Sequence, residues 1–261
     1  MSKHNLTIDE IRASFPSGKA FTDSENPLGT LVWRPLSYYP TWLFLRLGVS
    51  ANQVTALAIA VGITGCLLIA LGFYWSAILG VLFILLRALL DYTDGNVARC
   101  TNSTSRFGGY LDTIHQYTVT SLLPVGLGIG LFLHPDPALQ FISRSLFGLA
   151  VPRGLFLIAG FSSAFLTLFT YCISDRFAIS FAMKPRDFYR PSPSEKRSIW
   201  RLIFRVGLML ENVNSILMPV LLLAAIFKFL SVFLILWGLI TFSGFVAIAT
   251  RTMIRARKID G

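Results

Sequence analysis

The stretch SAILGVLFILLRALLDYTDGNVAR, from Ser76 to Arg99, decides the fold because it joins an apolar run directly to a polar cluster. Arg87 is the only charged residue of this stretch before Asp91, so most of it has the composition of a lipid-facing helix. About 20 mainly apolar residues are needed to cross the hydrocarbon layer of a bilayer as an α-helix. The stretch therefore predicts a transmembrane helix whose last turns carry Asp91 and Asp94.

The composition of the whole chain also indicates a membrane protein. Hydrophobic residues make up 54% of the 261 residues, charged residues make up 14%, and the mean hydropathy is +0.65. A chain this apolar and this poor in charge is not an ordinary soluble domain. The net charge of +10 is not a nucleic-acid signature, because the sequence has no soluble basic domain to carry one. We predict contacts with membrane lipids and no nucleic-acid partner.

We expect an all-α, polytopic fold with six transmembrane helices and an N-terminal amphipathic helix in the membrane interface. The interfacial helix is predicted at about 35–47, where aromatic residues lie close to Arg34 and Arg46. Residues 1–34 would form a cytoplasmic N-terminal segment, and residues 35–261 the membrane domain. The six spans lie between about residues 54 and 254 and are expected near Val54–Trp75, Ser76–Arg99, Phe107–Leu133, Gly148–Ile173, Val206–Phe227 and Phe229–Ile254.

The distribution of basic residues predicts the orientation of these spans. Short cytoplasmic segments of membrane proteins are enriched in Lys and Arg. Most of the 23 Lys and Arg residues lie before the first span, around Arg99 and Arg106, between Arg176 and Arg205, or after the last span. These four places share one side of a six-span topology. We therefore expect both termini and the acidic cluster to face the cytoplasm.

Helical spacing places the polar residues of the second span on one face. Residues three, four and seven positions apart share a side of an α-helix, so Asp91, Asp94, Gly95 and Ala98 lie together. The small residues Gly95 and Ala98 leave room for a ligand beside the two carboxylates. Asp91 on its own could equally pair with Arg87, one turn earlier in the same helix.

The third span supplies a matching stripe. Gly108, Asp112 and Gln116 share one face by the same rule, so two carboxylate-bearing helices are expected to face each other. Carboxylates at the edge of lipid are costly unless a cation pairs with them. Oxygen ligands of this kind suit Mg²⁺, Mn²⁺ or Ca²⁺, and Arg99 is placed to bind a phosphate oxygen. We predict a metal site at the mouth of the bundle.

The complete pattern resembles the signature of the CDP-alcohol phosphotransferase (CDP-alcohol phosphatidyltransferase) family, D-x2-D-G-x2-A-R-x8/9-G-x3-D-x3-D. Asn52 and Thr55 also resemble a looser Asn-x-x-Thr motif that borders the nucleotide site in that family. The positions that match the main signature, in order and at the expected offsets, are Asp91, Asp94, Gly95, Ala98, Arg99, Gly108 and Asp112.

The resemblance implies a transferase of phospholipid biosynthesis with two divalent ions, Mg²⁺ or Mn²⁺, and a fold that is commonly a homodimer. It implies transfer of a phosphoalcohol group, such as the phosphatidyl group of CDP-diacylglycerol, to an alcohol acceptor that can itself be phosphorylated, with release of CMP. The metal positions are then Asp91, Asp94, Asp112 and Gln116. The positions that bind the CDP-linked donor are Asn52, Thr55, Asp91, Gly95, Ala98, Arg99 and Gly108.

Gln116 departs from the signature, because the family has its last aspartate there and that aspartate is taken as the base that deprotonates the acceptor. An amide cannot accept this proton. In one interpretation His115 replaces the base and Gln116 stays as a neutral ligand. In a second, the acceptor needs no strong base. In a third, turnover is lost and the chain is a nucleotide- and lipid-binding membrane scaffold. The otherwise complete motif favours the first two together, although a histidine between helices more often serves as a buried polar contact.

Overall fold

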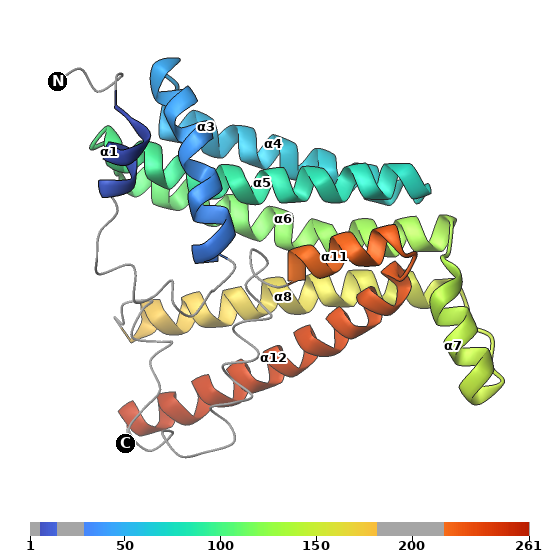
Figure 1. The fold of residues 1–261 in the computed structure, drawn as a ribbon. Coiled ribbons are helices and arrows are strands. Elements are labelled where there is room, and N and C mark those ends of the chain that lie inside the picture. Colours follow the sequence, from blue (N-terminus) through green and yellow to red (C-terminus); the bar gives the residue numbers. More distant parts are fainter. Residues whose placement is uncertain (1–5, 15–28, 182–216, 261) are drawn as a thin grey trace.

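The computed structural model describes residues 6–14, 29–181 and 217–260, and within these ranges the protein is helical with no strand (Figure 1). The all-α prediction is confirmed for this part of the chain. Five helices are long and apolar enough to cross a membrane, and they run roughly side by side as a bundle. They are α4 (Ala51–Ala70), α5 (Tyr74–Cys100), α6 (Arg106–Leu133), α8 (Gly154–Ser180) and α12 (Leu230–Asp260).

The fifth predicted span lies partly outside the described residues. Its described portion is α11 (Leu217–Ile226), an apolar helix of 10 residues that is too short to cross a bilayer by itself. The other five predicted spans each correspond to one of the long helices. The total of six spans stays a prediction.

The connection between the third and fourth spans differs from the prediction. Pro137–Phe147 form a separate helix, α7, and α8 begins at Gly154 and not near Gly148. Asp136 caps α7 by accepting a hydrogen bond of 3.1 Å from the amide of Ala138, and Gly148 ends the helix in the left-handed conformation with φ 65°. The apolar run continues across Gly148, so hydropathy alone could not separate the two helices.

The helix predicted at 35–47 is present as α3 (Arg34–Arg46), preceded by the π-helical turn η1 (Gly29–Trp33). Figure 1 shows α3 lying crosswise to the long helices at one end of the bundle, where it packs on α5. The short helix α1 (Ile8–Ala13) buries Ile11 in the same apolar cluster as Tyr38 of α3. The position of α3 in the lipid headgroup layer stays a prediction.

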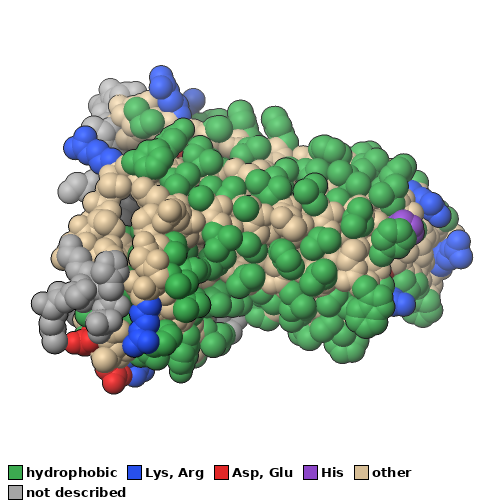
Figure 2. All heavy atoms as spheres, turned by 90° about the horizontal axis from the view of Figure 1, so that it is seen from above, with side chains coloured by type: hydrophobic (Ala, Val, Ile, Leu, Met, Phe, Trp, Pro, Cys, Tyr) green, Lys and Arg blue, Asp and Glu red, His purple; other side chains and the backbone are tan. Residues whose placement is uncertain are grey.

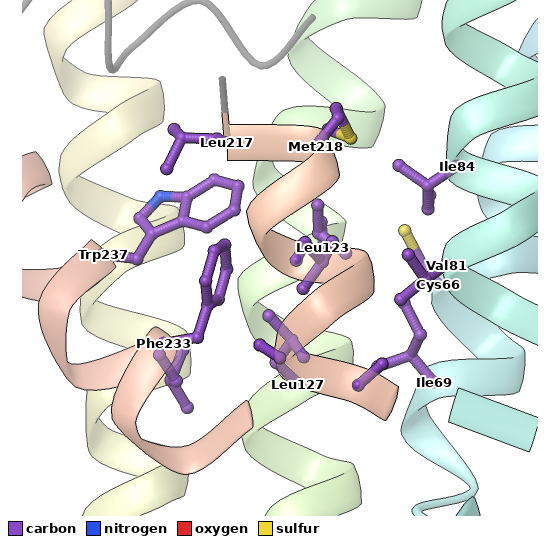
Figure 3. Close-up of a cluster of buried hydrophobic side chains, with 14 of the residues drawn as sticks. Cys66, Ile69, Val81, Ile84, Leu123, Leu127, Leu217, Met218, Phe233 and Trp237 are labelled. Atoms are coloured by element: carbon purple, nitrogen blue, oxygen red, sulfur yellow. The ribbon is translucent and has the colours of Figure 1, made fainter. Parts of the chain in front are cut away.

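The main apolar core surrounds α11 (Figure 3). Met218 of α11 is fully buried, and Phe233 and Trp237 of α12 meet edge to face with ring centroids 5.3 Å apart. Between helices in a bilayer, close packing supplies most of the attraction, because lipid tails are as apolar as the side chains. This core therefore depends on the fit of its side chains, which come from η1, α4, α5, α6, α8, α11 and α12.

The surface divides into an apolar middle and charged ends. Figure 2 shows hydrophobic side chains covering the middle of the visible face, whereas Lys and Arg gather at its two ends. This pattern and the long apolar helices indicate a multi-pass integral membrane protein. In Figure 1, α1 and the end of α12 lie at the end of the bundle where α5 ends and α6 begins, opposite α7. The aspartates of α5 and α6 belong to this end.

Candidate metal and nucleotide site

Carboxylates from two neighbouring helices meet at the end of the bundle that holds α3. Asp91 of α5 and Asp112 of α6 converge with His115, and one potential ligand atom from each residue lies within 4.8 Å of the others. Asp91 is half-buried, Asp112 is exposed and His115 is fully buried. The structure therefore brings together one carboxylate from each predicted stripe, Asp91 and Asp112.

Asp94 of α5 is anchored against α4. The hydroxyl of Thr55 donates a hydrogen bond of 2.5 Å to Asp94 Oδ2 and lies 3.1 Å from the carbonyl oxygen of Ala51. Both side chains are buried. The structure thus brings the looser Asn-x-x-Thr motif of α4 into contact with the main acidic motif. Asp94 is outside the three-residue group that Asp91, Asp112 and His115 form.

Asn52 and Gly108 also lie together, although they come from α4 and α6. A Cβ atom built at Gly108 would lie 3.2 Å from Asn52 Oδ1 and 3.3 Å from Ser105 Oγ. Ser105 begins α6 by accepting a hydrogen bond of 3.0 Å from the amide of Gly108. A side chain at position 108 would therefore crowd Asn52, which would have to shift by a few tenths of an ångström to admit even a methyl group.

Gly95 and Ala98 lie on the half-buried surface of α5, as expected. A Cβ atom built at Gly95 would meet only the guanidinium group of Arg99, whose nearest atom is 3.3 Å away. Arg99 is therefore folded back over the small residue at which a ligand was predicted to approach the helix. The flexible end of Arg99 can move aside, so the space above Gly95 is open to a ligand.

Asn96 holds Arg99 and was not identified from the sequence. Its side-chain carbonyl accepts a hydrogen bond of 2.5 Å from Arg99 Nη2, and its amide donates to Ser37 Oγ at 2.9 Å and to Thr41 Oγ1 at 3.2 Å. Asn96, Ser37 and Thr41 are each at most 2% exposed. The crosswise helix α3 thereby fixes the amide that orients Arg99. An asparagine inside a predicted span was the available signal.

His115 and Gln116 point to different surroundings. His115 Nε2 accepts a hydrogen bond of 2.7 Å from Arg87 Nε, and its Nδ1 lies 3.2 Å from Asp91 Oδ1. Gln116 is exposed. Because the lone pair of His115 Nε2 is already used and the ring is fully buried, this arrangement does not support the predicted role of His115 as a base. The exposed side chain of Gln116 stays available to a ligand.

A further carboxylate reaches α6 from α8. Tyr117 donates a hydrogen bond of 2.5 Å to Asp175 and stacks on Tyr171 with ring centroids 4.5 Å apart. Tyr117 directly follows Gln116 in α6, and Asp175 belongs to α8. The contact therefore places a carboxylate of α8 against α6. Sequence spacing could not predict this contact, because Asp175 lies outside the motif and its helix began later than expected.

Comparison with known proteins decides the family. Residues 48–179, about half of the chain, match the family model described as CDP-alcohol phosphatidyltransferase. The chain belongs to the CDP-alcohol phosphatidyltransferase family. The matched range contains α4, α5, α6, α7 and nearly all of α8, and with them every residue assigned above to metal or nucleotide binding. The resemblance inferred from the acidic motif is confirmed.

Two curated relatives of this CDP-alcohol phosphatidyltransferase family member are named as transferases or synthases. One is a cholinephosphotransferase 1 from Bos taurus, 33% identical over 119 residues, which are 41% of this chain and 29% of the relative. The other is an archaetidylinositol phosphate synthase from Pyrococcus horikoshii, 37% identical over 86 residues, which are 32% of this chain and 43% of the relative. The matches therefore span less than half of either relative.

A solved structure shares the fold. It is the crystal structure of Mycobacterium tuberculosis phosphatidylinositol phosphate synthase in complex with manganese and citrate. The TM-score is 0.52 at 19% sequence identity, and the superposition covers 85% of this chain and 89% of that chain. This similarity supports the fold of the membrane domain.

Proposed function

We propose that this protein transfers a phosphoalcohol group from a CDP-linked donor to an alcohol acceptor and releases CMP, in phospholipid biosynthesis. A phosphatidyl group carried by CDP-diacylglycerol is the donor we favour, because its acyl chains can remain in the bilayer beside an end of the bundle. The observation that carries the proposal is the convergence of Asp91 and Asp112 from two helices. Family membership and the names of both relatives support the same reaction class.

The donor set fits a divalent cation. The carboxylates of Asp91 and Asp112, from two different helices, have oxygen atoms within 4.8 Å of each other, which is the kind of oxygen donor set that Mg²⁺ and Mn²⁺ prefer. We infer that Asp91, Asp94 and Asp112 hold Mg²⁺ or Mn²⁺, as two ions, and that Gln116 adds a neutral oxygen ligand. The manganese in the structural neighbour supports this choice of ion. When bound, such ions offset the negative charge of the diphosphate and of departing CMP.

The remaining residues of the site would bind and orient the donor. Arg99 lies beside Gly95 and would pair with a phosphate oxygen, a contact that the guanidinium group makes well. Gly95 and Ala98 would admit the cytidine close to the backbone of α5. Asn52, Thr55 and Gly108 would border the nucleotide, because they line the junction of α4, α5 and α6.

The transfer itself exchanges one bond to phosphorus for another. The acceptor oxygen forms a bond to the phosphorus that carries the alcohol group, while the bond from this phosphorus to the bridging oxygen breaks and its electron pair leaves with CMP. The acceptor hydroxyl loses its proton, which passes to water at the open end of the site. Because His115 is buried and bonded to Arg87, an acceptor that needs no strong side-chain base fits this site better.

An assay of CMP release tests the proposed function. Purified protein would be mixed with CDP-diacylglycerol, Mn²⁺ and a panel of alcohols that includes phosphorylated polyols. We expect CMP release that requires Mn²⁺ and is lost in Asp91→Asn and Asp112→Asn, whereas Asp9→Asn, an exposed carboxylate change in α1, retains it. Absence of both Mn²⁺ and CDP-ligand binding in folded protein overturns the proposal.

The alternative function is a non-catalytic scaffold that binds nucleotide and lipid, and the exposed neutral side chain of Gln116 is the observation that favours it. Binding of CDP-diacylglycerol without CMP release, together with activity gained by Gln116→Asp, would support this alternative. Release of CMP by the wild-type protein with any acceptor of the panel excludes the scaffold function.

We also propose the orientation and assembly predicted from the sequence. Both termini and the acidic site would face the cytoplasm, because the basic segments of the chain lie on that side of the predicted topology. A homodimer in the membrane would cover part of the apolar surface that the single chain exposes. Labelling of Cys100, which ends α5 beside the acidic site, by reagents added to either side of the membrane tests the orientation, and cross-linking in native membranes tests the assembly.

A further inference from the structure

We propose that His115 is a positioning residue for Asp91, and that Arg87 fixes the imidazole in the orientation and protonation pattern this task requires. The inference rests on the proposed function because the carboxylate that His115 holds is a proposed metal ligand. It replaces the role of base that the sequence suggested for this histidine.

Three polar side chains form a chain through the interior of the bundle. Arg87 of α5 is 2% exposed and donates from Nε to His115 Nε2 over 2.7 Å. His115 of α6 is fully buried and places Nδ1 3.2 Å from Oδ1 of Asp91. Asp91 is 21% exposed and is the end of the chain that reaches the surface. The imidazole ring of His115 thus links the buried guanidinium group of Arg87 to the carboxylate of Asp91 at the mouth of the site.

The contact with Arg87 decides which imidazole nitrogen carries the proton. The guanidinium group of arginine can only donate hydrogen bonds, so the Nε2 atom that it contacts must offer a lone pair. A neutral imidazole with a lone pair on Nε2 carries its proton on Nδ1. The Nδ1–H group then faces the Asp91 carboxylate, and Nδ1 has no lone pair for a metal ion. His115 therefore presents an N–H group to a proposed metal ligand, 3.2 Å from Asp91 Oδ1, and is not a ligand itself.

In this arrangement His115 would contact one of the groups that bind the metal ion and would not bind the ion itself. Carboxylates that bind metals are commonly held in place by hydrogen bonds from neighbouring groups, and loss of such a neighbour typically lowers metal affinity about 10- to 100-fold. The 3.2 Å contact lacks hydrogen-bond geometry in this structure. The proposed role requires the two side chains to align when the site is occupied, and the variants below test this requirement.

The packing around Arg87 shows that the bundle makes room for this chain of contacts. A Cβ atom built at Gly62 of α4 would lie 3.2 Å from Arg87 Cγ and 2.6 Å from Val119 Cγ2. The glycine therefore leaves the volume that the arginine side chain occupies. Burying a guanidinium group is costly unless it is paired. The contact with His115 supplies one of its partners inside the bundle.

Two substitutions of His115 separate the roles of its two nitrogens. The side-chain amide of Asn places an N–H group near the Nδ1 position, so His115→Asn keeps a donor for Asp91 and loses the acceptor for Arg87. The longer side chain of Gln reaches the Nε2 position, so His115→Gln keeps an acceptor for Arg87 and loses the donor for Asp91. His134→Gln is the matched control, because His134 is exposed at the other end of α6.

The measurement is Mn²⁺ affinity by electron paramagnetic resonance, without substrate and in protein shown to be folded by its thermal unfolding. We expect the Kd to rise about 10- to 100-fold in His115→Gln. We expect it to stay within about threefold of wild type in His115→Asn and to be unchanged in His134→Gln. Equal affinity of His115→Gln and wild type, or equal losses in both His115 variants, overturns the inference. Absence of Mn²⁺ binding in wild type overturns the proposed function instead.

A second measurement needs no substitution. Nitrogen-15 spectra of protein labelled at histidine report which ring nitrogen carries the proton. Because Arg87 Nε donates to Nε2, we expect Nε2 of His115 to carry no proton and Nδ1 to carry one, with and without diamagnetic Mg²⁺. A His115 ring protonated on Nε2 overturns the inference, because Nε2 could then not accept a hydrogen bond from Arg87.

Discussion

The hydroxyl of Thr55 lies 2.5 Å from Oδ2 of Asp94 and donates a hydrogen bond to it, which joins α4 to the acidic motif of α5. Both side chains are buried, so no water replaces this bond if the hydroxyl is removed. The contact gives the threonine of the looser motif a physical role. It fixes the direction of a carboxylate that is proposed to hold a cation.

Thr55→Val tests this contact because valine has nearly the same shape but no hydroxyl. We expect the free energy of unfolding to fall by about 1–3 kcal/mol, since Asp94 loses a partner inside the protein. We expect Mn²⁺ binding to weaken as well. Thr55→Ser is the control, because it retains the hydroxyl. Calorimetry and thermal unfolding in detergent check both quantities, and equal behaviour of the two variants would contradict the role assigned to this bond.

Gly95→Ala separates ligand access from folding. The added methyl group would meet only the movable end of Arg99, and alanine favours a helix over glycine by about 1 kcal/mol, so stability should not fall. The methyl group would occupy space where the donor approaches α5. We expect the KM for the CDP-linked donor to rise at least about tenfold, on the order of 1.4 kcal/mol of lost binding.

Gly109→Ala provides the control for this experiment. A Cβ atom at Gly109 has no described atom within 4 Å, and the residue is exposed in the first turn of α6. It should leave the KM unchanged. An unchanged KM in Gly95→Ala, measured by CMP release at varied donor concentration, would show that the nucleotide does not approach this face.

The motif spacing predicted the meeting of Asp91 and Asp112 because two physical rules were enough. Helical periodicity defines which residues of each span share a face, and the short connection between Cys100 and Arg106 keeps the ends of α5 and α6 that carry these residues close together. These two rules did not place α4 at the site. Its part in the site was predicted only from the resemblance of Asn52 and Thr55 to the family motif. Its contact with Asp94 required knowledge of how α4 packs on α5.

Other features depended on contacts that spacing does not encode. His115 and Gln116 are adjacent in the sequence, yet one is buried against Arg87 and the other is exposed, because one step along a helix turns the side chain by about 100°. Asn96 of α5 and Ser37 of α3 form a hydrogen bond, although they lie 59 positions apart in the sequence. The helix α7 was missed because it lies between two predicted spans and is too short and too polar to give a transmembrane signal.

Asn96→Leu tests whether α3 orients Arg99. The hydroxyls of Ser37 and Thr41 also donate to backbone carbonyls, both at 2.7 Å, so they keep partners when the amide is lost. We expect the fold to persist and the KM for the CDP-linked donor to rise about 3- to 10-fold, on the order of 1 kcal/mol for a lost orienting bond.

A double variant and a control variant complete the test of Asn96→Leu. The double change Ser37→Ala and Thr41→Ala removes the acceptors of the Asn96 amide from a different helix, and it should raise the KM in the same direction. Thr64→Ala is the control, because this exposed hydroxyl donates only to the carbonyl oxygen of Ala60 within the described contacts. If the double variant matches wild type in CMP release, α3 has no part in placing Arg99.

Gly126→Ala tests the packing that holds the site together. A Cβ atom at Gly126 of α6 would lie 2.6 Å from the backbone oxygen of Cys66 in α4, and backbone cannot move aside as a side chain does. We expect a loss of about 1–3 kcal/mol in the free energy of unfolding, because overpacking forces the two helices apart. Gly244→Ala, with no described atom within 4 Å of the added carbon, should be neutral or slightly stabilising.

The same substitution has a consequence at the acidic end of the bundle. Helix α4 carries Thr55 and helix α6 carries Asp112, so a wider spacing between these helices moves groups that are proposed to act on one ligand. We expect Mn²⁺ affinity in Gly126→Ala to fall together with the melting temperature, and both to be unchanged in Gly244→Ala. A melting temperature lowered without any change in Mn²⁺ affinity would mean that the site tolerates movement of α4 against α6, and that Asp91 and Asp112 alone determine how the cation is bound.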